Sequence, residues 1–148
     1  MIKRAWSRAA ALAGGTAAVL AMTAVTAAPA QAAYWGNWHI LAYSDQCLDG
    51  SVSQGVRLNS CNGGSHQTWT KFGGYYGQIK HYQSGKCLDG SVSQGVRLKN
   101  CNGGSYQQWY PADNGDIVHY QSGKCLDGSV SQGVRLKDCN LGVYQGWW

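Results

Sequence analysis

Six cysteines in three pairs of equal spacing are the residues of this sequence with the clearest chemistry. Each pair is separated by 14 positions: Cys47 and Cys61, Cys87 and Cys101, Cys125 and Cys139. Cysteines that hold zinc usually lie two to four residues apart, and no pair has that spacing, so we predict no metal site. Because one spacing recurs, we expect one disulfide inside each unit rather than a mixed pairing. Closing a loop of about 15 residues contributes about 3 kcal/mol in the chain-entropy treatment.

The carboxylates and histidines form no catalytic pattern. Glycoside hydrolysis needs two carboxylates about 5 to 9.5 Å apart, yet the sequence contains no Glu and the Asp residues at equivalent repeat positions fall in separate units. Asp113 and Asp116 are close together but are expected to lie in a turn. No partner at catalytic spacing accompanies His39, His66, His81 or His119, and no nucleophile elbow, paired metal histidines or phosphate loop is present. We predict that the chain is not an enzyme and needs no cofactor.

An internal repeat is the strongest pattern in the sequence. The nineteen residues HYQSGKCLDGSVSQGVRLK occupy positions 81–99 and recur unchanged at 119–137, and the first unit carries their central part at 47–58. Each unit continues into Cys-Asn and ends with Gln-x-Trp. Units of this length usually cannot bury their apolar face alone and share one core. We expect Trp69, Trp109 and Trp147 in that core, with the Gln of each motif satisfying buried backbone groups.

Within a unit the pattern predicts strands. The segment 95–99 alternates with period two, which places Val96 and Leu98 inward and Arg97 and Lys99 outward. The same alternation sends Leu88 to the core and holds its neighbours Cys87 and Asp89 on the other side. Turn residues recur every few positions, and Asn-Gly at 114–115 is a strong hairpin signal. No stretch is long enough for a core helix, so the fold class is predicted to be all-β.

Closure into a three-fold barrel is the arrangement that best protects such strands, because it removes exposed sheet edges. The last unit stops at Trp148, one hairpin short of the other two. We therefore expect the aromatic opening segment, 34–40, to supply the missing strand beside it.

The first 32 residues have the pattern of a secretory signal peptide. Lys3, Arg4 and Arg8 precede an uncharged segment, 9–28, and a small-residue site at 30–32 follows it. The segment is weakly apolar for a membrane span of about 20 residues. We predict cleavage after about Ala32 and an extracellular product with no membrane span.

Nucleic acid is not an expected partner of that product. Without the three basic residues of the leader, nine Lys and Arg stand against seven acidic residues, a net charge of +2. The basic residues are scattered singly and form no stripe that could neutralise phosphates.

The three units together resemble the lobes of ricin-type β-trefoil lectins. The similarity rests on Cys87-Leu88-Asp89, the strand 96–98, the segment 101–106 and Gln107-Gln108-Trp109, each in register in the other units. The spacing is most similar to that of actinohivin-like lectins with three short repeats. The resemblance implies a single β-trefoil domain, 33–148, with pseudo-three-fold symmetry. Its lobes would be approximately 39–78, 79–116 and 117–148, closed by the segment 33–38.

The resemblance also implies a carbohydrate-binding function and a site in each lobe. A shallow sugar site needs a carboxylate for adjacent hydroxyls, an amide, and an aromatic face for the apolar side of the ring. By position the carboxylates are Asp49, Asp89 and Asp127, the amides are Asn62, Asn102 and Asn140, and the aromatic residues are Tyr106 and Tyr144. His66 stands at the aromatic position of the first lobe, where it would weaken the site or make binding depend on pH, since histidine titrates near neutrality.

Two departures from these lectins bear on specificity. Arg57, Arg97 and Arg135 stand where ricin-type lobes often have Gln, and Asn59, Lys99 and Lys137 stand where those lobes often have an aromatic platform. Arg is a fork-shaped donor suited to hydroxyl pairs or carboxylates, so the three arginines join the predicted site. We expect a neutral hexose as the first choice of ligand and an anionic sugar as the second.

Structural roles remain open for the same residues. Each Asp could cap a turn, and each Arg could lie on a solvated strand face. The loop Gly-Ser-Val-Ser-Gln-Gly is identical in all units, as shared recognition requires, although recent duplication explains it equally well. The competing function is that of a protein-binding trefoil, an inhibitor or a docking subunit of a secreted assembly, because fold alone does not fix function.

Overall fold

Short strands joined by tight turns make up most of the described chain. The computed structural model describes residues 33–37, 39–40 and 43–148, so the predicted leader lies outside the described residues. The strands are β1 (Ala33–Asn37), β2 (His39–Ile40), β3 (Tyr43–Ser51), β4 (Gly55–Ser60), β5 (Thr68–Gly73), β6 (Gly77–His81), β7 (Cys87–Ser91), β8 (Gly95–Lys99), β9 (Trp109–Pro111), β10 (Ile117–His119), β11 (Cys125–Ser129) and β12 (Gly133–Lys137). Two short 3-10 helices, η1 (Ser65–Gln67) and η2 (Ser105–Gln107), precede β5 and β9. The predicted all-β class is confirmed.

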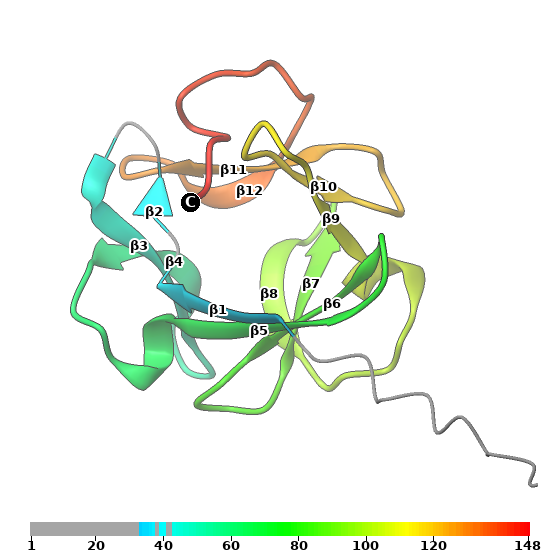
Figure 1. Ribbon diagram of the computed structural model, residues 1–148, viewed down its shortest axis with the longest axis horizontal. Helices are drawn as coiled ribbons and strands as arrows, with labels where there is room; N and C mark the ends of the chain where they lie inside the picture. The colour runs from blue at the N-terminus through cyan, green and yellow to red at the C-terminus, as the bar shows by residue number, and fades with distance from the viewer. Residues whose placement is uncertain (1–32, 38, 41–42) are drawn as a thin grey trace, which may run out of the picture.

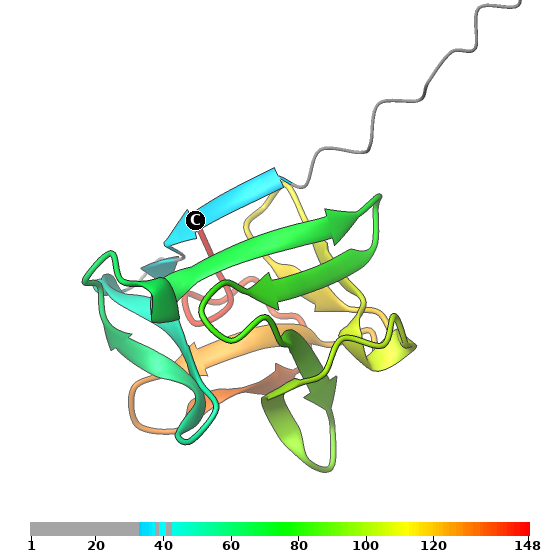
Figure 2. The same cartoon turned by 90° about the horizontal axis from the view of Figure 1, so that it is seen from below.

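Three equivalent hairpins, β3–β4, β7–β8 and β11–β12, come from the repeated segment and are arranged around the centre of the molecule (Figure 1). In each hairpin five equivalent residue pairs face one another, from Cys87↔Lys99 to Ser91↔Gly95 in the second. Seen from the side, β1 and the β5–β6 pair lie above the β11–β12 hairpin (Figure 2).

A three-residue turn fixes the register of each hairpin. The glycine that begins β8, Gly95, has φ of +76°, a left-handed conformation that other residues rarely adopt. The Ser91 hydroxyl accepts a hydrogen bond from the backbone N–H of Gln94 at 3.2 Å and closes the turn. The repeated Ser-Val-Ser-Gln-Gly sequence therefore has a structural reason in addition to any shared recognition.

The core lies where the three units meet, as expected for repeats that share one interior. Its buried members are Leu48, Trp69, Ile79, Leu88, Trp109, Ile117, Leu126 and Trp147. Each Trp indole N–H donates to the backbone carbonyl of the Leu in its own lobe, for example Trp109 to Leu88 at 2.9 Å. A Cβ on Gly90 would lie 2.8 Å from the Trp109 ring, so only glycine permits this close packing. Val96 and Leu98 pack against the core from β8, as the alternation predicted.

Disulfides join Cys47 to Cys61, Cys87 to Cys101 and Cys125 to Cys139. The predicted pairing of one disulfide per unit is confirmed. Each bond joins the first strand of a hairpin to the chain just beyond its second strand.

The longer sheet runs β1-β5-β6-β9-β10-β11-β12, with β7 added on β6 and β8 on β7. Its first strand, β1, pairs antiparallel with β5. At the other end of the chain the Trp147 backbone N–H donates to the Gly115 carbonyl at 2.9 Å. Among the described residues the opening strand thus lies beside a strand of the first lobe, and closure of the ring beside the last unit by the segment 33–38 stays a prediction.

Two fully buried histidines, His81 and His119, link consecutive lobes. The Nε2 of His119 lies 3.1 Å from the Tyr106 carbonyl, so this nitrogen carries the proton. The Nδ1 lies 2.9 Å from the Ser122 hydroxyl, which donates to it. His81 repeats the arrangement with the His66 carbonyl at 3.0 Å and the Ser84 hydroxyl at 2.8 Å. Both histidines are therefore built into the structure as neutral rings.

Acidification should destabilise the fold through these rings. Burial lowers the pKa of His81 and of His119 below the ordinary value of 6.5. The unfolded chain therefore binds more protons below about pH 6.5, and the free energy of unfolding falls with pH from there. Each tenfold difference in proton affinity corresponds to about 1.4 kcal/mol. We expect a lower urea midpoint at pH 5 than at pH 7.5.

A double variant, His81→Gln with His119→Gln, should flatten this dependence, whereas His66→Asn at an exposed position should preserve it. An unchanged midpoint across the range in the wild-type chain would contradict the prediction.

Candidate functional site

The carboxylate predicted to bind the ligand in each lobe is already held by an arginine. The β7–β8 register places Asp89 opposite Arg97. The Asp89 Oδ1 accepts from Arg97 Nε at 2.9 Å and lies 2.9 Å from its Nη2. Only 3% of Asp89 is exposed. The sequence pattern placed the two residues on one side of the hairpin but did not predict that their side chains would form an ion pair with each other.

A buried amide holds the other oxygen of the same carboxylate. Gln107, from the Gln-x-Trp motif, donates from Nε2 to Asp89 Oδ2 at 3.3 Å and to the Asn100 carbonyl at 3.0 Å. Its Oε1 accepts from the backbone N–H of Asn102 at 2.9 Å. The glutamine was expected to satisfy backbone groups. It also positions the carboxylate of the site.

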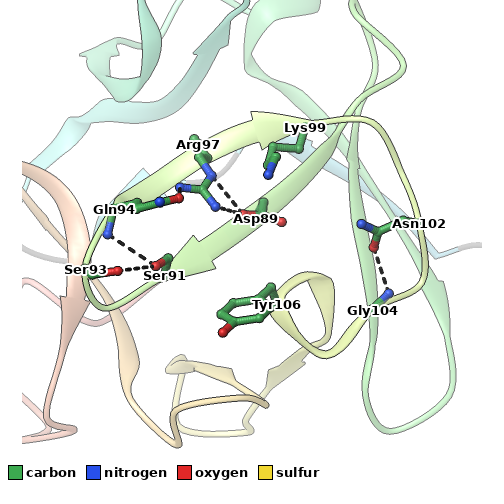
Figure 3. Close-up of a pocket in the computed structure, with 9 residues that line it drawn as sticks. All are labelled: Asp89, Ser91, Ser93, Gln94, Arg97, Lys99, Asn102, Gly104 and Tyr106. Atoms are coloured by element: carbon green, nitrogen blue, oxygen red, sulfur yellow. Dashed lines mark hydrogen bonds and ion pairs between the residues drawn. The ribbon is translucent and has the colours of Figure 1, made fainter.

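These residues border a hollow of about 340 Å³ in the second lobe. Its lining consists of Asp89, Ser91, Ser93, Gln94, Arg97, Lys99, Asn102, Gly104 and Tyr106. Figure 3 shows Arg97 and Lys99 along β8 and the Tyr106 ring across the hollow from them. The hollow thus brings together all four predicted site residues of the second lobe. The prediction did not include five residues of the lining: Lys99, Gly104, Ser91, Ser93 and Gln94. The last three belong to the turn, and the repeated loop sequence could have indicated them.

Asn102 and Tyr106 contribute on the open side. The Asn102 Oδ1 accepts from the backbone N–H of Gly104 at 2.8 Å, so its oxygen serves the turn, and its NH₂ group has no acceptor among the described residues. Tyr106 is 49% exposed, which leaves ring face and hydroxyl available for contact.

A second hollow of about 330 Å³ adjoins the first and shares Ser91, Ser93 and Tyr106 with it. Val92 continues its wall, and Gln121 and Ser122 from the segment after β10 complete it. The combined surface therefore extends from the second lobe onto the third.

The third lobe repeats the second closely. Arg135 Nε donates to Asp127 Oδ1 at 2.9 Å, and Gln145 Nε2 donates to Asp127 Oδ2 at 3.3 Å. Asn140 accepts from the Gly142 N–H at 2.8 Å. Tyr144 is 40% exposed and stands in the position of Tyr106.

The first lobe differs at its edge. Arg57 Nη2 lies 2.8 Å from Asp49 Oδ1, and Arg57 Nη1 has no hydrogen-bond partner among the described residues. Asn62 makes the same turn as its counterparts, with the Gly64 N–H at 2.8 Å. The exposed His66 donates from Nδ1 to the Gly50 carbonyl at 2.9 Å. This ring is therefore tied to the β3 backbone.

Neither a metal site nor a membrane-spanning helix is found in the part of the chain that the structure describes. No group of three or more His, Cys, Asp or Glu side chains there could hold an ion. No described helix is long and apolar enough to cross a bilayer.

Comparison with known proteins identifies the domain. Residues 35–147 match the ricin-type beta-trefoil lectin domain. The chain belongs to the ricin-type β-trefoil lectin family. The predicted trefoil fold is thereby confirmed, and carbohydrate binding is the activity of this domain at the level of the family. No curated protein matches the sequence.

Solved structures agree with the assignment of a ricin-type trefoil. The designed three-fold symmetric protein ThreeFoil is 31% identical, with a TM-score of 0.67 over 77% of this chain and 94% of that one. The hemolytic lectin CEL-III is 22% identical, with a TM-score of 0.67 over 80% of this chain and 30% of its own. A non-toxic homologue of type II RIPs from Momordica charantia, solved with α-methyl-D-galactoside, is 20% identical, with a TM-score of 0.66 over 76% of this chain and 46% of its own. The chain thus spans less than half of each of these two natural proteins.

Replacement of the buried Gln107 should lower the free energy of unfolding more than replacement of the adjacent Gln108. Gln107→Leu leaves the Asn102 N–H and the Asn100 carbonyl without partners, and each such group costs about 1–3 kcal/mol. We expect the free energy of unfolding to fall by about 2 to 3 kcal/mol in a urea titration. Gln108→Thr, which introduces the residue of the first lobe at the adjacent half-buried position, should change it by less than about 0.5 kcal/mol. Equal losses in the two variants would contradict the role assigned to Gln107.

Proposed function

We propose that this protein is a secreted, non-catalytic lectin with up to three equivalent sugar sites, one in each lobe, that act together on surfaces displaying many glycans. The observation that carries the proposal is the hollow of the second lobe, where a carboxylate-arginine pair, an amide and an exposed tyrosine line one surface. The predicted site residues of the other two lobes have equivalent positions in the repeat.

The lining has the properties that a sugar requires. The exposed Tyr106 ring offers a face to the apolar side of a pyranose ring. The Asn102 NH₂ and the hydroxyls of Ser91 and Ser93 offer hydrogen bonds to sugar oxygens. The adjoining hollow, completed by residues of the third lobe, supplies room for a second sugar unit. An oligosaccharide therefore fits the combined surface better than a single sugar.

Two features of the chain support secretion. The signal-peptide pattern of residues 1–32 predicts export. The three disulfides are bonds that form and persist in oxidising compartments.

A glycan array tests the proposal directly. The chain 33–148, oxidised and labelled, should bind a defined group of glycans. A variant with Asp49, Asp89 and Asp127 all changed to Asn should lose that binding, because each Asp orients the arginine of its site. Since those carboxylates are buried, Tyr106→Ala with Tyr144→Ala provides a second test at exposed positions and should weaken binding at least tenfold. A folded wild-type chain that ignores every glycan would defeat the proposal, as would undiminished binding by the folded tyrosine variant.

Multivalency predicts a second result. Three linked sites raise the apparent affinity for a dense sugar surface by about 10² or more over that for the free oligosaccharide. Surface plasmon resonance on dense and sparse glycan layers, with the free oligosaccharide as competitor, measures this difference. A single functional lobe would give similar affinities on both layers, contrary to the proposal.

One surface favours the alternative function of a protein-binding trefoil. Tyr75, in the β5–β6 turn, is 66% exposed and stacks on Tyr110 with ring centroids 3.8 Å apart. Tyr76 meets Tyr120 edge to face at 4.9 Å. The Tyr75-Tyr76 pair belongs to the first unit alone, as expected of a surface with one specific protein partner. Tyr75→Ser should leave glycan binding unchanged if the lobes are the sites.

A further inference from the structure

We infer that the second and third lobes select sugars carrying a negative charge, whereas the first lobe takes a neutral sugar. The inference rests on the proposed lectin function and specifies the ligand of the same sites. From the sequence we expected a neutral hexose before an anionic sugar. The inference reverses this order for the second and third lobes and keeps it for the first.

The first argument concerns hydrogen-bond acceptors. A carboxylate offers about four acceptor positions, and a lectin carboxylate free of other contacts could give them to neighbouring sugar hydroxyls. Here Arg97 directs two N–H groups to Asp89 Oδ1, and Gln107 directs one to Oδ2. With 3% of Asp89 exposed, little of the carboxylate is left for a ligand.

Donors without an acceptor also line the hollow. The Gln94 Oε1 accepts from Arg97 Nη1, and the Asn102 Oδ1 accepts from the Gly104 N–H. The amide NH₂ of Asn102 and the ammonium group of Lys99 are donors for which no acceptor is found among the described residues. Groups of this kind bind acceptor-rich ligands, and most strongly an anionic oxygen.

The second argument concerns charge. Asp89 and Arg97 cancel one another at 2.9 Å, so Lys99 gives the hollow a net positive charge. Lys137 occupies the same position in the third lobe, two residues beyond Arg135. In the first lobe that position is Asn59, and the Asp49–Arg57 pair leaves the site neutral. The first lobe is thus an uncharged counterpart, within the same chain, of the basic sites in the second and third lobes.

The third lobe is expected to be the weaker of the basic pair. Asp138 directly follows Lys137, and its side chain is 92% exposed and paired with Lys124. Its counterpart in the second lobe is the neutral Asn100, which accepts from Lys86 at 2.7 Å. At this position the third lobe therefore carries one more negative charge than the second.

The test compares matched sugars that differ in charge. Trigalacturonic acid and sialyllactose are each titrated against their neutral methyl esters, with the oxidised chain 33–148 in low salt. An exposed ion pair contributes about 0.2 to 1 kcal/mol, so the wild-type chain should prefer the acidic member of at least one pair by about 1.4- to fivefold. Because the charges are exposed, about 0.5 M NaCl should remove the preference.

Variants that exchange the residues of the lobes give the decisive comparison. Lys99→Asn with Lys137→Asn introduces the first-lobe residue into both basic sites and should abolish the preference without loss of folding, since both positions are exposed. Asn59→Lys should increase the preference by adding a third basic site. The inference is overturned by equal binding of both members of each pair, or by a preference that persists in the double variant.

Failure of the inference and failure of the proposed function give different results. A chain that binds neutral glycans on the array but shows no preference for charge is a lectin without the selectivity inferred here. A folded chain that binds no glycan at all removes the proposed function, and the inference with it.

Discussion

A single buried amide connects the core of each lobe to the Asp-Arg pair at its surface. The side chain of Gln107 joins the Asp89 carboxylate of β7, the Asn100 carbonyl beyond β8 and the Asn102 N–H of the following turn. The next residue but one, Trp109, fills the core and donates to β7 from the other direction. Gln67 and Gln145 make the same three contacts in their lobes. The Gln-x-Trp motif thus fixes both the packing of the hairpin and the orientation of its polar face.

The buried residues of this arrangement are the same in all three lobes, whereas the residues at its exposed edge differ. The amide, the indole and the Asp-Arg pair recur in every lobe, because each completes contacts that leave a buried group unsatisfied when broken. The residues at the outer edge of the site differ: Asn59 against Lys99 and Lys137, and His66 against Tyr106 and Tyr144. The same buried framework therefore carries outer edges of different composition in the three lobes.

Much of this structure could be predicted from the sequence because the same local patterns occur in each of the three repeats. Equal cysteine spacing predicted the disulfides, period-two alternation predicted Val96 and Leu98 against the core, and the family pattern predicted the trefoil. The closure of Asp89 by Arg97 was missed, since alternation says which face a residue occupies and not which residue stands opposite. Knowledge that the hairpin has a three-residue turn would have been enough to place Asp89 opposite Arg97, which is eight residues further along the chain. The contact from Gln107, 18 residues beyond Asp89, depends on the path of the chain after the hairpin and has no local signal.

The short sequence separation of each disulfide also bears on how the chain acquires its fold. Three identical Cys-Leu-Asp-Gly segments give the cysteines no local chemistry by which to recognise the correct partner. Proximity along the chain supplies it instead, because the loop-closure entropy is smallest for cysteines that are close in sequence, and each native pair is only 14 residues apart. Oxidation can then proceed one lobe at a time, in the order of synthesis. A chain of near-identical repeats thereby avoids the non-native disulfides that its own repetition would otherwise permit.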